Sequence, residues 1–222
     1  MRRQDAKKAA AYLKRIVRDP FSRQSRAAMK RYMVEAVMLV YEKLRGLDFT
    51  MVYQCENNEH NNNYSKSPKK VLKRIFEEID FTEKHNFIDM GCGKGYVMAK
   101  AAEYPFEKVG GVEYTKELCD ICRKNIDILG LKDIEIYNCD AKEFDRYGEY
   151  DVFYFCNPFD ETILSEVAKK IYESHKKSKC TIYFLNPHQE KRQKAIKDAG
   201  FKLTKCMEDE SEKYFDINVY KN

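Results

Sequence analysis

The run Asp89-Met90-Gly91-Cys92-Gly93-Lys94-Gly95 lies where an apolar segment, 87–90, gives way to a helical pattern that begins near residue 95. Glycine recurs at every second position of this run. Glycine lets the backbone turn sharply and approach a ligand closely because it has no Cβ atom. The run therefore predicts a strand, a tight ligand-binding loop and a helix in succession.

Short apolar segments alternate with helical patterns on the carboxyl side of this run. Each apolar segment is four to six residues long and is bounded by turn residues, as expected for buried strands. We expect these strands at 87–90, 108–113, 134–138, 151–156 and 181–185. The alternation with helices predicts an α/β fold built on a buried, mainly parallel sheet.

The two ends of the chain depart from this alternation. Residues 201–206 and 213–220 predict two further strands joined by an acidic turn, so we expect a terminal antiparallel β-hairpin. Residues 1–18 and 22–46 predict two helices of an amino-terminal extension, followed by a polar loop at 54–67. The second helix has an apolar stripe that we expect to be buried, against its own sheet or in a dimer. The stripe comprises Met29, Met33, Val37, Val40, Tyr41 and Leu44.

Basic charge is concentrated in this extension. Residues 1–46 contain thirteen Lys and Arg against four Asp and Glu, a net charge of +9, whereas the whole chain has +5. The rest of the chain therefore has a net charge of −4. The asymmetry fits either a solvated helical surface or attraction to an acidic partner such as nucleic acid.

Composition excludes several classes of protein. The sequence has no uncharged apolar run of about 18 residues and no apolar segment typical of a signal peptide, so we expect a cytoplasmic protein without a membrane partner. Its eight cysteines are then expected to be free thiols. Cys119 and Cys122 form the one C-x-x-C pair, and no second pair completes a zinc site, so we predict core packing and no metal.

Two nucleotide-site patterns compete for the glycine run. A dinucleotide site requires G-x-G-x-x-G, and the third glycine of that pattern would fall at Tyr96. This departure disfavours a nicotinamide dehydrogenase. The alternate glycines preceded by Asp89 form D-x-G-x-G-x-G, which resembles the first motif of the Rossmann-like, or class I, S-adenosylmethionine-dependent methyltransferases.

Acidic residues at the next two strand ends strengthen the resemblance. A carboxylate at Glu113 can accept hydrogen bonds from both ribose hydroxyls. The resemblance implies that Asp140 accepts from the adenine amino group while the backbone of Ala141 meets the ring. It also implies that Tyr64 belongs to a segment that closes over the cofactor. The predicted site for S-adenosylmethionine, and for its product S-adenosylhomocysteine, comprises Asp89, Gly91, Cys92, Gly93, Gly95, Glu113, Tyr114, Asp140, Ala141 and Tyr64.

The resemblance covers residues 67–220. It implies a seven-stranded methyltransferase sheet with helices on both faces and an antiparallel last strand, in agreement with the predicted hairpin. We therefore predict two domains, a helical extension with its polar loop at 1–66 and a cofactor-binding methyltransferase domain at 67–222.

The fourth predicted strand leads into Asn157-Pro158-Phe159, which we predict to be the catalytic segment. It is similar to the N-P-P-Y of enzymes that methylate planar amines, in which the Asn side chain and a Pro carbonyl orient the amine. The second proline is missing here, and Asn-Pro is also a common turn after a strand. Asn186-Pro187-His188 repeats the pattern after the fifth strand, either as a helix-start turn or as part of the same cleft.

These observations predict an enzyme that transfers a methyl group to a nitrogen or oxygen of a small-molecule or protein acceptor. Two alternatives remain open. One is a nucleic-acid methyltransferase that uses the basic amino-terminal helices to hold RNA or DNA. The other is a non-catalytic module that binds S-adenosylmethionine. The sequence names neither the acceptor nor the oligomeric state.

Overall fold

A computed structural model describes residues 22–51, 66–186, 189–209 and 215–222. The chain divides into two compact units, Met1–Gly46 and Leu47–Asn222. The described part of the first unit is essentially one helix, α2 (Arg23–Arg45). The predicted helix at 1–18 lies outside the described residues, and the domain boundary at residue 66 stays a prediction.

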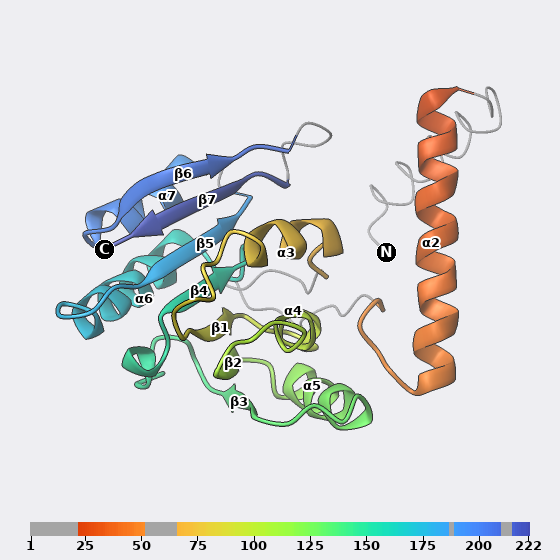
Figure 1. Ribbon diagram of the computed structural model, residues 1–222, viewed down its shortest axis with the longest axis horizontal. Helices are drawn as coiled ribbons and strands as arrows, with labels where there is room; N and C mark the ends of the chain where they lie inside the picture. The colour runs from red at the N-terminus through yellow and green to blue at the C-terminus, as the bar shows by residue number, and fades with distance from the viewer. Residues whose placement is uncertain (1–21, 52–65, 187–188, 210–214) are drawn as a thin grey trace. The chain divides into compact units, whose positions relative to one another are not determined.

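The second unit is built on one seven-stranded sheet in the order β3-β2-β1-β4-β5-β7-β6 (Figure 1). β1 pairs in parallel with β2 and β4, β3 joins β2, and β5 joins β4. β7 runs antiparallel between β5 and β6, so the predicted terminal hairpin and seven-stranded α/β sheet are confirmed. The strands are β1 (Asn86–Met90), β2 (Lys108–Glu113), β3 (Ile134–Asn138), β4 (Val152–Phe155), β5 (Thr181–Leu185), β6 (Lys202–Met207) and β7 (Ile217–Lys221).

Helices cover both faces of the sheet because successive strand residues point to opposite sides. Phe87 belongs to the core beneath α3, α4 and α5, whereas its neighbour Ile88 belongs to the core beneath α6 and α7. This double burial explains the continuous apolar strands of the sequence. The helices are α3 (Lys69–Phe76), α4 (Tyr96–Ala101), α5 (Lys116–Ile128), the short 3-10 helix η1 (Tyr147–Glu149), α6 (Glu161–Ser174) and α7 (Glu190–Asp198).

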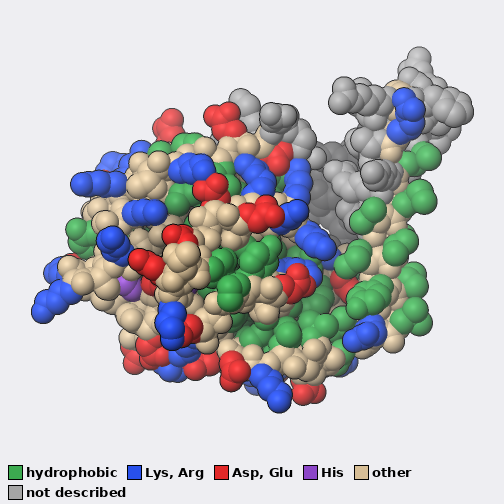
Figure 2. Space-filling view, viewed as in Figure 1, with side chains coloured by type: hydrophobic (Ala, Val, Ile, Leu, Met, Phe, Trp, Pro, Cys, Tyr) green, Lys and Arg blue, Asp and Glu red, His purple; other side chains and the backbone are tan. Residues whose placement is uncertain are grey.

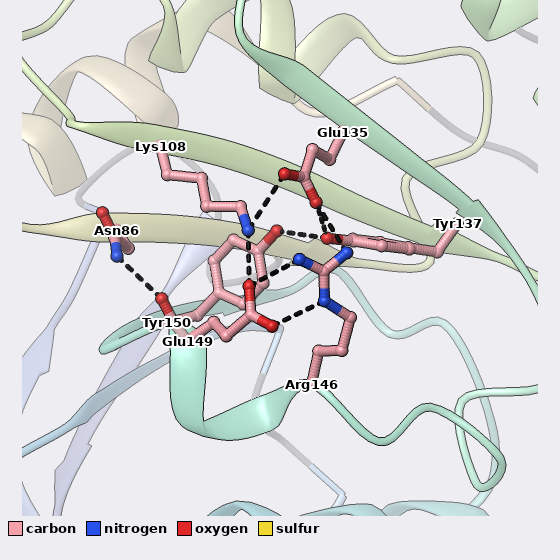
Figure 3. Close-up of polar contacts among 7 residues, drawn as sticks. All are labelled: Asn86, Lys108, Glu135, Tyr137, Arg146, Glu149 and Tyr150. Atoms are coloured by element: carbon pink, nitrogen blue, oxygen red, sulfur yellow. Dashed lines mark hydrogen bonds and ion pairs between the residues drawn. The ribbon is translucent and has the colours of Figure 1, made fainter.

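Charged side chains at the amino ends of β2 and β3 pair with one another and with η1 (Figure 3). The Lys108 ammonium lies 2.6 Å from a carboxylate oxygen of Glu149 and 3.0 Å from one of Glu135. The Arg146 guanidinium donates to the same two carboxylates. Hydrogen bonds from Arg146 and then Lys108 lower the pKa of Glu149 from 4.5 to about 2. Each of these four charges thus has an opposite partner.

The start of α3 differs from the simplest sequence interpretation. Ser67 followed by Pro68 predicts a helix capped by the serine hydroxyl. In the structure Pro68 is the N-cap residue, and no side chain caps the helix. The Ser67 hydroxyl lies instead 2.9 Å from the hydroxyl of Tyr154 on β4, so it satisfies a buried phenol. The capping prediction is wrong because the serine hydroxyl hydrogen-bonds to Tyr154, a residue distant in sequence.

Helix α2 agrees with the predicted 22–46 helix, but its apolar stripe is exposed. Met33, Val37 and Leu44 are 65%, 66% and 82% exposed, and Figure 2 shows hydrophobic side chains along this helix. The burial of this stripe, against its own sheet or in a dimer, stays a prediction. No helix in the described part of the chain combines the length and apolar character needed to cross a membrane.

Candidate functional site

The loop at 91–95, here called the glycine loop, joins β1 to α4 at the carboxyl end of the parallel strands. Gly91, Gly93 and Gly95 have φ angles of +90°, +51° and +84°, which residues with a Cβ atom rarely adopt. A Cβ atom on Gly91 would lie 2.4 Å from Cβ of Pro158, and one on Gly95 would lie 2.5 Å from Sγ of Cys122. The loop therefore requires glycine both for its conformation and for its close packing.

Two acidic side chains lie against this loop. Glu113, at the end of β2, accepts hydrogen bonds from the backbone N–H groups of Gly93 at 3.0 Å and Thr115 at 2.8 Å. Burial raises the pKa of Glu113, and burial together with the nearby Glu113 charge raises the pKa of Asp89 well above 3.8. A cationic ligand that brings hydroxyl donors would relieve both effects. The pair therefore fits S-adenosylmethionine, which has a sulfonium, an ammonium and two ribose hydroxyls.

The end of β3 is joined to the end of β2 by Asn138. Its amide donates to the carbonyl oxygens of Glu113 and Tyr114, each at 3.0 Å. Asp140 accepts from the backbone N–H of Lys142 at 2.8 Å, which fixes its carboxylate at this strand end. Sequence reasoning missed Asn138, although a polar residue that ends a strand beside a predicted ligand-binding acid is a usable signal.

The other predicted cofactor residues occupy different surroundings. Tyr114 is exposed, and Ala141 is buried in the core beneath α6. Cys92 is buried beside Cys122, and the hydrogen bond between the two thiols and burial raise its pKa, which disfavours the thiolate. Tyr64 lies outside the described residues.

The predicted catalytic segment meets the glycine loop at Pro158, the neighbour of Gly91 described above. Asn157 has a left-handed backbone, φ +52°, and so does Asn186 after β5, φ +57°. Such conformations in residues other than glycine are sparsely populated and are concentrated at functional sites. Phe159 is buried with its ring against Phe155, 6.0 Å between centroids, so it anchors the segment in the core.

The C-x-x-C pair packs in the core beside the glycine loop, whereas His85 and His175 lie away from it. Cys119 and Cys122 are buried on α5, and no group of three or more metal-binding side chains occurs among the described residues. His85 pairs with Asp151 just before β4, and His175 follows α6 and contacts the carbonyl of Tyr150 at 2.7 Å. Both histidines thus lie at the amino ends of the strands, away from the glycine loop.

A seven-stranded sheet with an antiparallel seventh strand, a glycine loop after β1 and an acid at the end of β2 are the features expected of the class I methyltransferase fold. The chain matches the family described as methyltransferase domain over residues 81–216, more than half of its length. It therefore belongs to this family, the methyltransferase domain.

Two curated relatives methylate proteins according to their names. The chain is 38% identical over 102 residues to a histone H3 lysine-79-specific N-methyltransferase of Dictyostelium discoideum, a match that covers 38% of this chain and 6% of that protein. It is 28% identical over 103 residues to a protein-L-isoaspartate O-methyltransferase of Thermotoga maritima, covering 44% and 32%. The matches thus span less than a third of each relative.

Solved structures support the fold at low sequence identity. The magnesium protoporphyrin IX methyltransferase of Synechocystis PCC 6803, solved with bound S-adenosylhomocysteine, has a TM-score of 0.53 and 13% identity. The similarity covers 68% of this chain and 81% of that one. It establishes a shared fold and leaves the acceptor open.

Proposed function

We propose that this enzyme methylates a side-chain nitrogen of a protein, with the acceptor bound beside Asn157 and Pro158. The observation that carries the proposal is the packing of Pro158 on Gly91, which puts the predicted catalytic segment, residues 157–159, against the predicted cofactor loop. Two relatives with protein acceptors support the class of substrate.

The predicted cofactor residues divide the ligand between them. Glu113 would accept from the ribose hydroxyls, Asp140 and the backbone of Ala141 would hold the adenine, and Asp89 would favour the cationic end. When bound, S-adenosylmethionine supplies a methyl group already activated by its sulfonium. The task left to the protein is to place the acceptor lone pair in line with that methyl.

The predicted catalytic segment suits an acceptor amine that arrives deprotonated. Asp160, three residues after Asn157, is engaged as the N-cap of α6, where its carboxylate accepts from Thr162 N at 3.0 Å and Ile163 N at 3.1 Å. The Asn157 side chain and nearby carbonyl oxygens would accept from an amine and orient it. Such orientation requires no side-chain base.

The test is to incubate the full chain with methyl-labelled S-adenosylmethionine and separate pools of protein, RNA, DNA and metabolites. We expect label in protein that survives alkali, because N-methyl groups are stable where carboxyl methyl esters hydrolyse. Asn157→Ala should lower kcat by about 10²-fold while S-adenosylhomocysteine binds as in the wild type. Label confined to metabolites, or full turnover in Asn157→Ala, would refute the proposal.

A second candidate is methylation of nucleic acid, which the net charge of +9 in residues 1–46 favours. It predicts label in the RNA or DNA pool, and binding to that nucleic acid that weakens steeply as salt rises. Label in protein together with salt-independent binding of the acceptor would exclude it.

A further inference from the structure

Lys94, in the middle of the glycine loop, is almost fully buried at 2% exposure. Its ammonium donates to a carboxylate oxygen of Asp48 at 2.7 Å and to the carbonyl oxygen of Met51 at 2.8 Å. Both partners belong to residues 47–51, here called the strap, which precede the loop by forty or more positions. A buried charge needs such partners, so the lysine and the strap fix each other in place.

Asn125 on α5 makes a second link between the strap and the glycine loop. Its amide nitrogen donates to the carbonyl oxygens of Asp48 and Lys94, each at 3.0 Å, and its oxygen accepts from the Asp48 N–H at 2.9 Å. The Asn125 side chain is buried, and its bond to the Lys94 carbonyl is shielded from water. Lys94 is thereby held at both its side chain and its carbonyl.

Apolar and cation–π contacts seat the strap on the start of α4. The Phe49 ring meets Tyr96 edge to face, with 5.4 Å between centroids. Lys66 donates to the Thr50 hydroxyl at 2.6 Å, and its ammonium lies 4.9 Å from the centroid of the Tyr96 ring. The strap is therefore part of the packed α/β unit, although it lies outside the 81–216 region that defines the family.

We propose that Lys94, Asp48 and Asn125 are positioning residues for S-adenosylmethionine, and that the strap is a structural part of the cofactor site. Lys94 stands between Gly93 and Gly95, both left-handed, and glycine loses more conformational freedom on ordering than any other residue. Pinning Lys94 at two points holds the loop in its observed conformation before the ligand arrives, which leaves less ordering to be done on binding. The inference rests on the predicted role of the glycine loop in cofactor binding.

The test uses the full chain and calorimetric titration with S-adenosylhomocysteine, alongside thermal unfolding without ligand. Lys94→Met and Asp48→Asn should each weaken S-adenosylhomocysteine about tenfold or more. In turnover the KM for S-adenosylmethionine should rise, while kcat at saturating cofactor changes by less than about threefold, as expected when ground-state and transition-state binding are lost together.

A matched control separates positioning from general stability. Lys108→Met removes a paired lysine of the same unit at the opposite end of the strands, so it should lower Tm and leave the S-adenosylhomocysteine Kd unchanged. Asp48→Asn keeps the shape of a side chain that is 38% exposed, and it supplies the measurement if Lys94→Met fails to fold.

The proposal is overturned if Asp48→Asn binds S-adenosylhomocysteine within about twofold of the wild type, or weakens it no more than Lys108→Met does. Glu113→Ala serves as the marker of the cofactor site. If it also binds normally, the glycine loop is not the cofactor site and the inference fails with that prediction. The acceptor is not needed in this assay, so an error in the proposed acceptor leaves its outcome unaffected.

Discussion

The two ends of the parallel strands are built on opposite principles. At the amino ends Lys108, Glu135, Arg146 and Glu149 are paired with opposite charges (Figure 3). At the carboxyl ends the chain places left-handed residues and acidic side chains whose pKa values burial raises. Proteins keep strain and unfavourable charge where function needs them and compensate elsewhere. From this difference we expect the amino ends to serve stability and the carboxyl ends to bind the ligand.

The largest effect that would sharpen this comparison is expected from Gly91→Val. The added side chain would overlap Pro158 and would need a left-handed backbone that valine strongly disfavours. We expect loss of S-adenosylhomocysteine binding in calorimetry and a fall in kcat/KM of about 10²-fold or more.

Gly130→Ala is the control for Gly91→Val. Gly130 also has a positive φ, +65°, but a Cβ atom there would meet nothing within 4 Å. It should lower Tm slightly through backbone strain and leave cofactor affinity unchanged. Equal losses of affinity in the two variants would remove the argument from close packing.

A smaller effect is expected from Asp89→Asn, which should raise stability while it weakens ligand binding. The raised pKa means that the folded protein holds this proton more tightly than the unfolded chain does. Its contribution to stability therefore falls as pH rises above 3.8 toward the folded pKa, so the buried carboxyl lowers stability at neutral pH. The variant should gain about 2–4 °C in Tm at neutral pH while binding S-adenosylhomocysteine more weakly.

Thermal unfolding at several pH values, with and without S-adenosylhomocysteine, measures both effects of Asp89→Asn. Its gain in Tm should disappear at acidic pH, where the wild-type carboxyl is protonated in both states. A lower Tm at neutral pH would show that the carboxylate stabilises the fold, which contradicts the contrast drawn between the two edges.

The smallest effect is expected from Glu149→Gln at the amino edge. The lowered pKa of Glu149 means that its stabilisation is fully present above pH 4.5 and is lost as pH falls toward about 2. The side chain is 40% exposed, so solvent screening limits the loss at neutral pH to about 0.2–1 kcal/mol. Urea unfolding at neutral and acidic pH should show this loss only at neutral pH, with S-adenosylhomocysteine affinity unchanged throughout. An effect on affinity would mean that the amino edge also serves the ligand.

Much of the fold could be predicted because its signals are local. The strands at 108–113, 134–138 and 181–185 have the bounds expected from their apolar patterns. The partners of individual polar groups could not be predicted in the same way. Ser67 has the residue type and position of a helix cap, yet its hydroxyl meets Tyr154, 87 positions away. Likewise, nothing in the amphipathic pattern of α2 indicates whether its stripe is covered.

The sequence alone determined the order of strands and helices along the chain, the glycine loop and the acids at the carboxyl ends of β1 to β3, since backbone preference and apolar periodicity act over a few neighbouring residues. Only the tertiary structure decided that Pro158 packs on Gly91, that Lys94 reaches back to Asp48, and that opposite charges gather at one edge of the sheet. These pairs are distant in sequence, and chain folding brings them together through burial and charge pairing that no local pattern encodes.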